Sequence, residues 1–279
     1  MEYRYKIQRR RRTYLVRRAV TFFSLLAIIG CVLLVVRMGQ GEGTSIFVPA
    51  PQAEEANPGT NTSSGTSQPV AGELAAANPT LEGLADIVVD TSCPFYEAAM
   101  PILVNRENFI PESHNPDLVS IGNGLYLNRR AAAAWQAMRT AAAEDGINLW
   151  VISAYRSHER QTYNFNNSVQ NHIAAGRTPE EAHAITAGYI AVPGTSEHTL
   201  GMAIDVNYIG AAFEHSAEFE WLIENGASFG YIFRYPRDKT EITGINFEPW
   251  HFRYVGSNHA QIIMEMGIVL EEYIELFGS

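Results

Sequence analysis

An apolar run from Ala19 to Val36 most restricts what the N-terminal part of this 279-residue chain can fold into. Only two hydroxyl residues interrupt the run, and arginines lie on both sides of it. Its eighteen residues would rise about 27 Å as a helix, close to a bilayer core of about 30 Å. Because more positive charge precedes the run than follows it, we predict a single-pass protein of the cell membrane. Residues 1–18 would be a basic cytoplasmic segment and 19–37 the transmembrane anchor, with everything after them extracytoplasmic.

Two other interpretations of the apolar run remain open. A secretory signal peptide would be cleaved, but no small-x-small site follows the run, and the run is long for such a peptide. The segment Ile28-Ile29-Gly30-Cys31 loosely resembles a lipoprotein processing site. Five apolar residues follow that cysteine directly, where a lipoprotein normally turns polar. We therefore favour an anchor that stays attached.

Residues 38–80 have the composition of a flexible linker. They are rich in Gly, Ser, Thr, Pro, Ala and Asn and contain few large apolar side chains. Such a segment cannot bury enough surface to offset the entropy cost of ordering it. We expect it to tether a globular domain over residues 81–279 with an r.m.s. reach of roughly 35 Å.

Charge and cysteine content restrict the partners and the kind of metal site. Residues 1–37 carry a net charge of about +8, whereas the remainder carries about −18 and shows no basic stripe with interleaved aromatic residues. We therefore do not expect nucleic-acid binding. Cys31 lies in the apolar run, which leaves Cys93 alone in the exported part. The domain must then be stabilised by its core, and a metal site in it must use His and carboxylate ligands.

Helix and strand patterns mix without regular alternation in residues 81–279, so we predict an α+β domain with a small antiparallel sheet flanked by helices. An Ala-rich helix is predicted over 129–145, and Ser157 should cap a helix that ends near Gly176. A capping box from Thr178 to Glu181 should begin another helix. The remaining predictions are helices over 216–225 and 258–277 and strands over 148–154, 203–207, 231–234 and 251–255.

Two short segments of this domain carry side chains suited to a metal ion. The first contains His198 and Asp205, and the second is Glu248-x-x-His251. Together they offer two imidazoles, one carboxylate for the metal and a second, spare carboxylate. A catalytic zinc needs three protein ligands, an open position for water and a nearby base. Glu248 precedes the predicted strand that His251 opens, and this separation suits a base that lies beside the metal.

These segments resemble the zinc D-alanyl-D-alanine carboxypeptidases of the VanY type, in a group that also contains D-Ala-D-Ala dipeptidases and the Hedgehog-like fold. The family pattern Ser-x-His-x-x-Gly-x-Ala-x-Asp is met from Ser196 to Asp205, and its Glu-x-x-His element is met by Glu248 and His251. The resemblance covers roughly residues 100–275. A third family element is met by Ser153, Tyr155, Arg156, Ser157 and Gln161.

The resemblance implies a role for each residue of these elements. The implied Zn²⁺ ligands are His198, Asp205 and His251. Glu248 would be the catalytic base, and Arg156 would stabilise the oxyanion that develops during the reaction. Ser196 and Gln161 would contact the terminus of the substrate.

The implied activity is removal of the C-terminal D-alanine from peptidoglycan stem peptides by metal-activated water. Other enzymes of the group would act as L,D-carboxypeptidases, D,D-dipeptidases or peptidoglycan endopeptidases, and the sequence leaves these open, together with the oligomeric state. A non-catalytic, zinc-stabilised module that binds the cell wall is the alternative outside the enzymes. Such a module could lose Glu248 and Arg156 freely, and both are present, so we expect an enzyme.

Overall fold

The computed structural model describes residues 90–111 and 113–278, which fall within one compact unit of the chain, Pro79–Ser279. The predicted cytoplasmic segment, anchor and linker, residues 1–80, lie outside the described residues. In the part that is described, no helix is both long and apolar enough to cross a membrane. What can be described is therefore the globular domain that the sequence places after the linker.

A four-stranded antiparallel sheet organises this domain, with the strand order β3-β4-β6-β5. Its strands are β3 (Val151–Ser153), β4 (Ala203–Val206), β5 (Tyr231–Phe233) and β6 (His251–Tyr254). Every residue of β4 and β6 is buried, because these strands lie in the middle of the sheet. Asp205 pairs with His251 and Ile204 pairs with Phe252. Since side chains alternate along a strand, the first pair lies on one face and the second pair on the other.

Helices pack on both sides of the sheet. On the Phe252 side, Phe219 of α6 (Ala217–Asn225) places its ring against Phe252 and Phe233. Each such buried aromatic side chain contributes about 1.5–3 kcal/mol. The helix α2 (Arg129–Glu144), as predicted, meets β5 where the Tyr231 hydroxyl donates to the Ala131 carbonyl at 2.7 Å. A second apolar cluster joins Ile232 of β5 to α8 (Ser257–Met266) and α9 (Leu270–Phe277).

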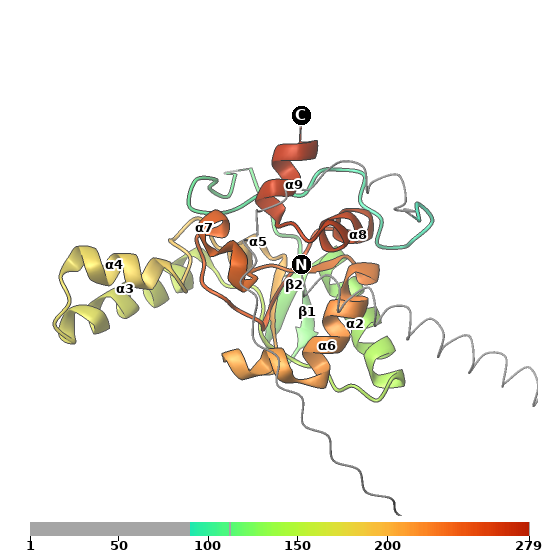
Figure 1. Cartoon of the computed structure of the whole chain (residues 1–279), viewed down its shortest axis with the longest axis horizontal. Helices are drawn as coiled ribbons and strands as arrows, with labels where there is room; N and C mark the ends of the chain where they lie inside the picture. Colours follow the sequence, from blue (N-terminus) through green and yellow to red (C-terminus); the bar gives the residue numbers. More distant parts are fainter. Residues whose placement is uncertain (1–89, 112, 279) are drawn as a thin grey trace, which may run out of the picture. The chain divides into compact units, whose positions relative to one another are not determined.

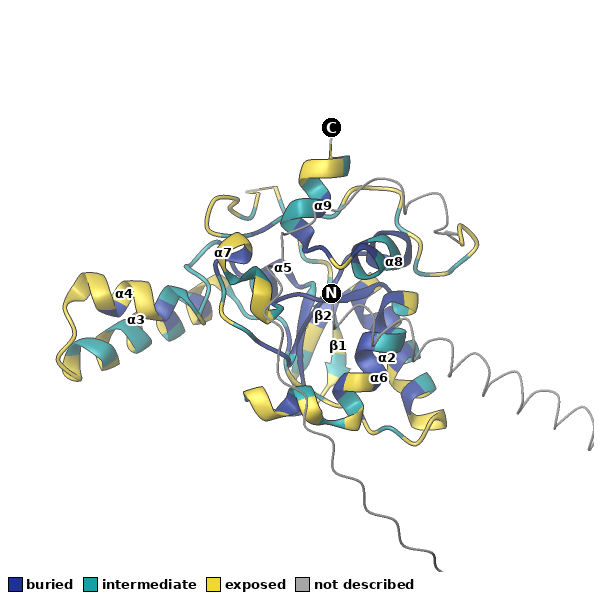
Figure 2. Ribbon diagram, viewed as in Figure 1, coloured by how far each residue is buried: buried dark blue, intermediate teal, exposed yellow. Residues whose placement is uncertain are grey.

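Two further helices, α3 (His158–Ala174) and α4 (Pro179–Ala187), form a hairpin that projects from the sheet (Figure 1). Both of its predicted starts are confirmed. The Ser157 side chain accepts from the Arg160 backbone, and Thr178 and Glu181 form the reciprocal capping box. Figure 2 shows that most of the hairpin surface is exposed. Its buried residues are Gln161, Phe165, Ala182 and Thr186.

Two elements differ from the sequence prediction. The single helix predicted over 258–277 is wrong, because Gly267 adopts a left-handed conformation with φ of 64° and ends α8 before α9 begins. The hairpin of β1 (Leu118–Gly122) and β2 (Leu125–Asn128) was not predicted. Its turn is Asn123-Gly124, with φ of 53° and 72°, and Asn-Gly is the sequence most typical of such turns. The α+β class with small antiparallel sheets is confirmed.

The remaining elements are short and connect the larger ones. The first of them, α5 (Glu197–Leu200), stands directly before β4 and is ended by Gly201, with φ of 79°. The others are η2 (Ala211–His215), η3 (Gly226–Phe229), η4 (Arg237–Lys239) and α7 (Thr240–Thr243). The left-handed glycine turns the chain sharply, so that α5 lies at the end of β4 and beside its polar face.

Candidate metal centre and active site

The strand register brings two of the predicted ligands together. Asp205 of β4 and His251 of β6 are cross-strand partners on the same face of the sheet. The Nδ1 atom of His251 lies 3.2 Å from Oδ1 of Asp205. Burial by itself lowers the pKa of His251, but hydrogen bonds to Asp205 and Glu197 outweigh burial and raise it to about 9. A cation at this place would compete with that proton for Nδ1.

His198 of α5 completes the group from outside the sheet. Its Nδ1 atom lies 2.7 Å from the backbone carbonyl of Ala154. A carbonyl oxygen only accepts, so Nδ1 carries the hydrogen, and the Nε2 atom is left with a free electron pair. Nε2 lies 3.3 Å from Oδ2 of Asp205. Burial lowers the pKa of His198, which favours the neutral ring that a metal requires.

The three side chains fit a zinc ion. His198, Asp205 and His251 each offer one ligand atom, and these atoms all lie within 4.8 Å of one another. All three side chains are buried. Two neutral imidazoles with one carboxylate form a donor set that zinc accepts in catalytic sites, with one position left for water. The structure therefore brings together the residues that the sequence analysis assigned to the metal.

Glu248 lies beside this group and outside it. Its Oε2 atom is 4.0 Å from Nδ1 of His251, and the residue is 8% exposed. Burial raises the pKa of Glu248 to about 7, although His251 and Arg156 act in the opposite direction. A carboxylate with a pKa in this range can accept a proton and release it again near neutral pH.

Arg156 is held in place at the end of β3. Its Nη1 atom donates to Oε1 of Gln161 at 2.9 Å, and its Nη2 atom donates to the Ser153 hydroxyl at 3.2 Å. Gln161 is completely buried, and its Nε2 atom donates to the Ala191 carbonyl at 2.5 Å. Burial lowers the pKa of Arg156, and the nearby carboxylates of Asp205 and Glu248 act in the opposite direction, so the guanidinium lies near the candidate metal centre. In this structure Gln161 holds Arg156, and the predicted contact of Gln161 with a substrate stays a prediction.

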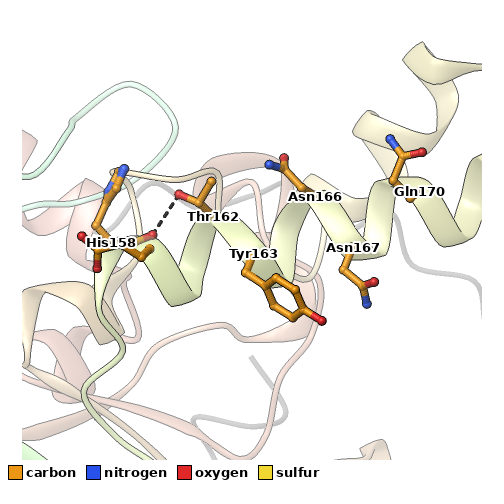
Figure 3. A pocket seen from close by; sticks show the side chains of 7 residues that line it. His158, Thr162, Tyr163, Asn166, Asn167 and Gln170 are labelled. Carbon is orange, nitrogen blue, oxygen red and sulfur yellow. Dashed lines mark hydrogen bonds between the residues drawn. The ribbon is translucent and has the colours of Figure 1, made fainter.

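Ser196 is the N-cap of α5 and is 2% exposed, so it lies close to the candidate ligands in the fold. Its predicted contact with the substrate also stays a prediction. An open hollow lies elsewhere, along the outer face of α3 (Figure 3). No residue of the predicted site lines this hollow. The residues that line it are His158, Glu159, Thr162, Tyr163, Asn166, Asn167 and Gln170.

The sequence analysis missed one residue of the centre, Glu197. Its side chain is fully buried, and Oε2 lies 3.1 Å from Nε2 of His251. Burial alone would raise the pKa of Glu197, but Arg234 and Arg253 outweigh it and hold the pKa well below its usual range. Glu197 is thus an anion and accepts the Nε2 hydrogen, which leaves Nδ1 of His251 to face Asp205. No local pattern identifies this role, because the arginines come from β5 and β6, more than thirty residues away.

The comparisons with known proteins agree on one family. Residues 124–257 match the VanY family, described as D-alanyl-D-alanine carboxypeptidase. The crystal structure of a VanY D,D-pentapeptidase variant from a VanB-type resistance cassette, in complex with Zn(II), is 44% identical to this chain. It has a TM-score of 0.57, and the alignment covers 62% of this chain and 97% of that one. The chain belongs to the VanY family.

Other VanY relatives are similarly close. The structure of VanYB in complex with D-alanine-D-alanine has a TM-score of 0.58 and 43% identity, covering 63% of this chain and 97% of that one. The D-alanyl-D-alanine carboxypeptidase of Enterococcus faecalis is 43% identical over 173 residues, which are 62% of this chain. The aligned part is 65% of that relative, just under two thirds of its length. The predicted family is confirmed. The predicted cofactor is Zn²⁺, which is bound in the structure of the VanY variant and suits the donor set of His198, Asp205 and His251.

Proposed function

We propose that this VanY-family protein is a zinc-dependent carboxypeptidase that removes the C-terminal D-alanine from peptidoglycan stem peptides. One observation supports the proposal above all others. A buried His/Asp/His group converges beside a separate buried carboxylate, Glu248, and a fixed guanidinium, Arg156. A binding module would need only the first of these three parts, whereas hydrolysis of a peptide bond uses all three.

The metal would be held by His198 through Nε2, by Asp205 and by His251 through Nδ1, because the other ring nitrogens are engaged. When bound there, Zn²⁺ lowers the pKa of a water molecule to about 7 and polarises a carbonyl group. The contacts behind the ligands fix the two rings. The Ala154 carbonyl holds His198, and the Glu197 carboxylate holds His251.

Glu248 would carry the proton during the reaction. A carboxylate oxygen of Glu248 would accept a proton from the attacking water and pass it to the nitrogen of the leaving D-alanine. Its burial supports this role, because a desolvated carboxylate is a stronger base than one in water. Since Glu248 lies on the loop before β6 and not within the ligand group, it is free to exchange a proton with the substrate.

Arg156 would stabilise the negative charge that develops on the carbonyl oxygen of the substrate. An arginine cannot lose its charge at neutral pH, and Ser153 and Gln161 hold this one in a single orientation. Ser196 and Gln161 would contact the terminal carboxylate of the substrate. For Gln161 this contact would come in addition to its bonds to Arg156 and Ala191, because its amide NH2 group carries a second hydrogen besides the one donated to Ala191.

We propose that residues 19–37 anchor the protein in the cell membrane, and that 38–80 tether an extracytoplasmic domain to it. The apolar run and the arginines before it support this arrangement. Cell fractionation tests the anchor: the full chain should sediment with membranes, and a variant that lacks 19–37 should not. Recovery of the full chain in the soluble fraction would contradict the anchor and leave the enzymatic proposal intact.

The enzymatic proposal is tested with the purified full-length chain, zinc and a pentapeptide that ends in D-Ala-D-Ala, with products read by mass. We expect loss of one alanine in wild type and no loss after a chelator is added. Release of intact D-Ala-D-Ala would move the cleavage to the bond before it, hydrolysis only of the free dipeptide D-Ala-D-Ala would assign a D,D-dipeptidase, and cleavage only of a tetrapeptide would assign an L,D-carboxypeptidase. If zinc binds and neither peptides nor whole peptidoglycan are cleaved, the protein is a binding module and the proposal is wrong.

A further inference from the structure

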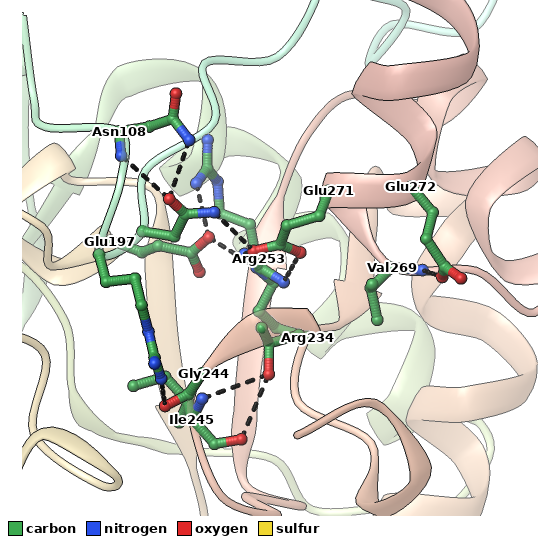
Figure 4. Close-up of polar contacts among 12 residues, drawn as sticks. Asn108, Glu197, Arg234, Gly244, Ile245, Arg253, Val269, Glu271 and Glu272 are labelled. Atoms are coloured by element: carbon green, nitrogen blue, oxygen red, sulfur yellow. Dashed lines mark hydrogen bonds and ion pairs between the residues drawn. The ribbon is translucent and has the colours of Figure 1, made fainter. Parts of the chain in front are cut away.

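A line of ion pairs in the interior runs from the C-terminal helix to the candidate metal centre, and Figure 4 shows the part of it formed by Glu271, Arg234 and Glu197. It begins at Glu271 of α9, passes through Arg234 at the end of β5 and through Glu197 of α5, and ends at the ring of His251. Glu271 lies outside residues 124–257, the part of the chain that the family comparison matches. Segments that are distant in the sequence are therefore linked in series to one ring of the site.

The contact at the end of the line, between Glu197 and His251, sets the orientation of the imidazole ring. Oε2 of Glu197 accepts from Nε2 of His251, while Oε1 accepts from Arg234 at 2.8 Å and from Arg253 at 2.9 Å. Both oxygens of Glu197 are thus in use, and its side chain is 0% exposed. If this carboxylate rotated, the hydrogen bond to His251 would be lost, and nothing else is seen to hold Nε2 among the described residues.

The contact with Glu271 fixes the position of Arg234. Its Nη1 and Nη2 atoms donate to the two oxygens of Glu271 at 2.8 and 2.6 Å, in the bidentate geometry that gives a guanidinium one orientation. Asn105 donates to the same carboxylate at 3.1 Å. Arg234 is 1% exposed, so protein groups and not solvent hold its guanidinium. The position of Arg234, and with it that of Glu197, depends on α9.

The charges of this line balance. Glu197 and Glu271 are anions, Arg234 and Arg253 are cations, and all four lie at or close to the interior of the domain. Neutralising Glu271 leaves an excess positive charge and one unpaired guanidinium nitrogen in a place with little water. An amide at 271 has one acceptor oxygen, and its NH2 group would face a nitrogen of Arg234 that also only donates, so the bidentate geometry is lost. Arg234 must then shift, and it takes the Glu197 carboxylate with it.

We propose that Glu271 is a positioning residue of the metal centre: through Arg234 and Glu197 it fixes the ring of His251 and thereby sets the affinity for the metal. This inference rests on the proposed function, in which His251 is a ligand. Residues that hold a ligand from behind typically change metal affinity by about 10- to 100-fold when they are replaced. Glu271, 20 residues after the last ligand in the sequence, then makes the C-terminal helix part of the site.

The experiment compares three variants of the full-length chain, Glu197→Gln, Glu271→Gln and Glu275→Gln. Glu275 lies on the same helix as Glu271 and is exposed, so its replacement controls for lost charge on α9. The zinc affinity of each protein is measured by competition with a chromophoric chelator. We expect a loss of about 10- to 100-fold for Glu197→Gln, a loss of roughly tenfold for Glu271→Gln and an unchanged value for Glu275→Gln.

The visible spectrum of bound Co²⁺ separates positioning from general destabilisation, because it reports the ligand geometry in the fraction that is folded. Glu271→Gln should change this spectrum, and Glu271→Asp should restore part of the affinity. If Glu271→Gln binds zinc as wild type does and its Co²⁺ spectrum is unchanged, the inference is wrong. If wild type binds no zinc, the proposed function fails instead. If Glu271→Gln does not fold, the test rests on Glu271→Asp, whose shorter side chain changes the geometry of the contact with Arg234. A zinc affinity and a Co²⁺ spectrum equal to those of wild type in that variant would contradict the inference.

Discussion

The centre of the sheet and the α3–α4 hairpin are stabilised in opposite ways. In β4 and β6 every residue is buried, and the charged side chains among them are paired with groups from distant segments. In the hairpin most residues are exposed, and apart from those of buried Gln161 its polar contacts mainly join its own two helices and the turn after them. A charge inside the sheet is costly unless its partner is present, whereas an exposed polar group on the hairpin can bond to water. Substitutions of similar size should therefore have very different effects in the two regions.

The largest effect is expected at the spare carboxylate of the centre. Glu248→Gln keeps the size and burial of the side chain but removes its ability to accept a proton. We expect hydrolysis of a peptide ending in D-Ala-D-Ala to fall by at least about 10³-fold, near the upper end for loss of a general base. The zinc content measured in the same sample should be unchanged. Loss of the metal in this variant would show that Glu248 is a ligand.

A somewhat smaller effect is expected at the guanidinium. Arg156→Met removes the charge that Ser153 and Gln161 hold beside the metal centre. We expect kcat/KM to fall by about 10²- to 10³-fold, the usual cost of one oxyanion stabiliser. Arg160→Met is the matched control, because Arg160 lies on the exposed face of α3 against the ring of Tyr163. Equal losses in the two variants would refute the assignment of Arg156.

The contrast between buried and partly exposed groups is sharpest for the stability that two ion pairs outside the hairpin confer. Arg234→Met leaves the buried carboxylates of Glu197 and Glu271 without their shared partner. We expect the free energy of unfolding in urea to fall by about 3–5 kcal/mol. Lys239→Met removes a partly exposed ion pair with Glu272 and should cost about 1 kcal/mol or less. Similar costs in both variants would mean that burial does not set the strength of these pairs.

The smallest effect is expected in the hairpin. The Tyr189 hydroxyl lies 2.6 Å from the Ser168 hydroxyl and 2.8 Å from Nε2 of His172, in a residue that is 42% exposed. Tyr189→Phe should lower the free energy of unfolding by about 1 kcal/mol or less, because water replaces the lost partner. Zinc affinity should not change. A loss of zinc affinity in this variant would show that the hairpin and the metal centre are coupled after all.

The same contrast explains what the sequence could predict. The hairpin is specified locally, since Ser157 and the Thr178 capping box determine where each helix begins, and both starts were predicted. The ligand group was recognised from its motif, although the register that joins Asp205 to His251 could not be derived from spacing. The role of Glu197 could not be predicted, because it depends on contacts with Arg234 and Arg253 that form only in the folded domain.

Two misses have local causes that were overlooked. Asn123-Gly124 is a strong hairpin signal, but the strands around it are short and only partly buried, so their alternation is weak. Gly267 interrupts an amphipathic pattern that continues in phase on both sides, so the pattern alone suggested one helix. The break matters for the site, because it lets α9 turn and present Glu271 to Arg234.

Anomalous diffraction at the zinc absorption edge, from crystals of the full-length chain grown with zinc, is the most direct test of the metal ligands and the base. We expect one anomalous peak bonded to Nε2 of His198, to a carboxylate oxygen of Asp205 and to Nδ1 of His251. The oxygens of Glu248 should lie beyond bonding distance, and Oε2 of Glu197 should remain hydrogen-bonded to Nε2 of His251. A peak bonded to Glu248, or to Nε2 of His251, would contradict the assignment of ligands and base on which the proposed mechanism depends.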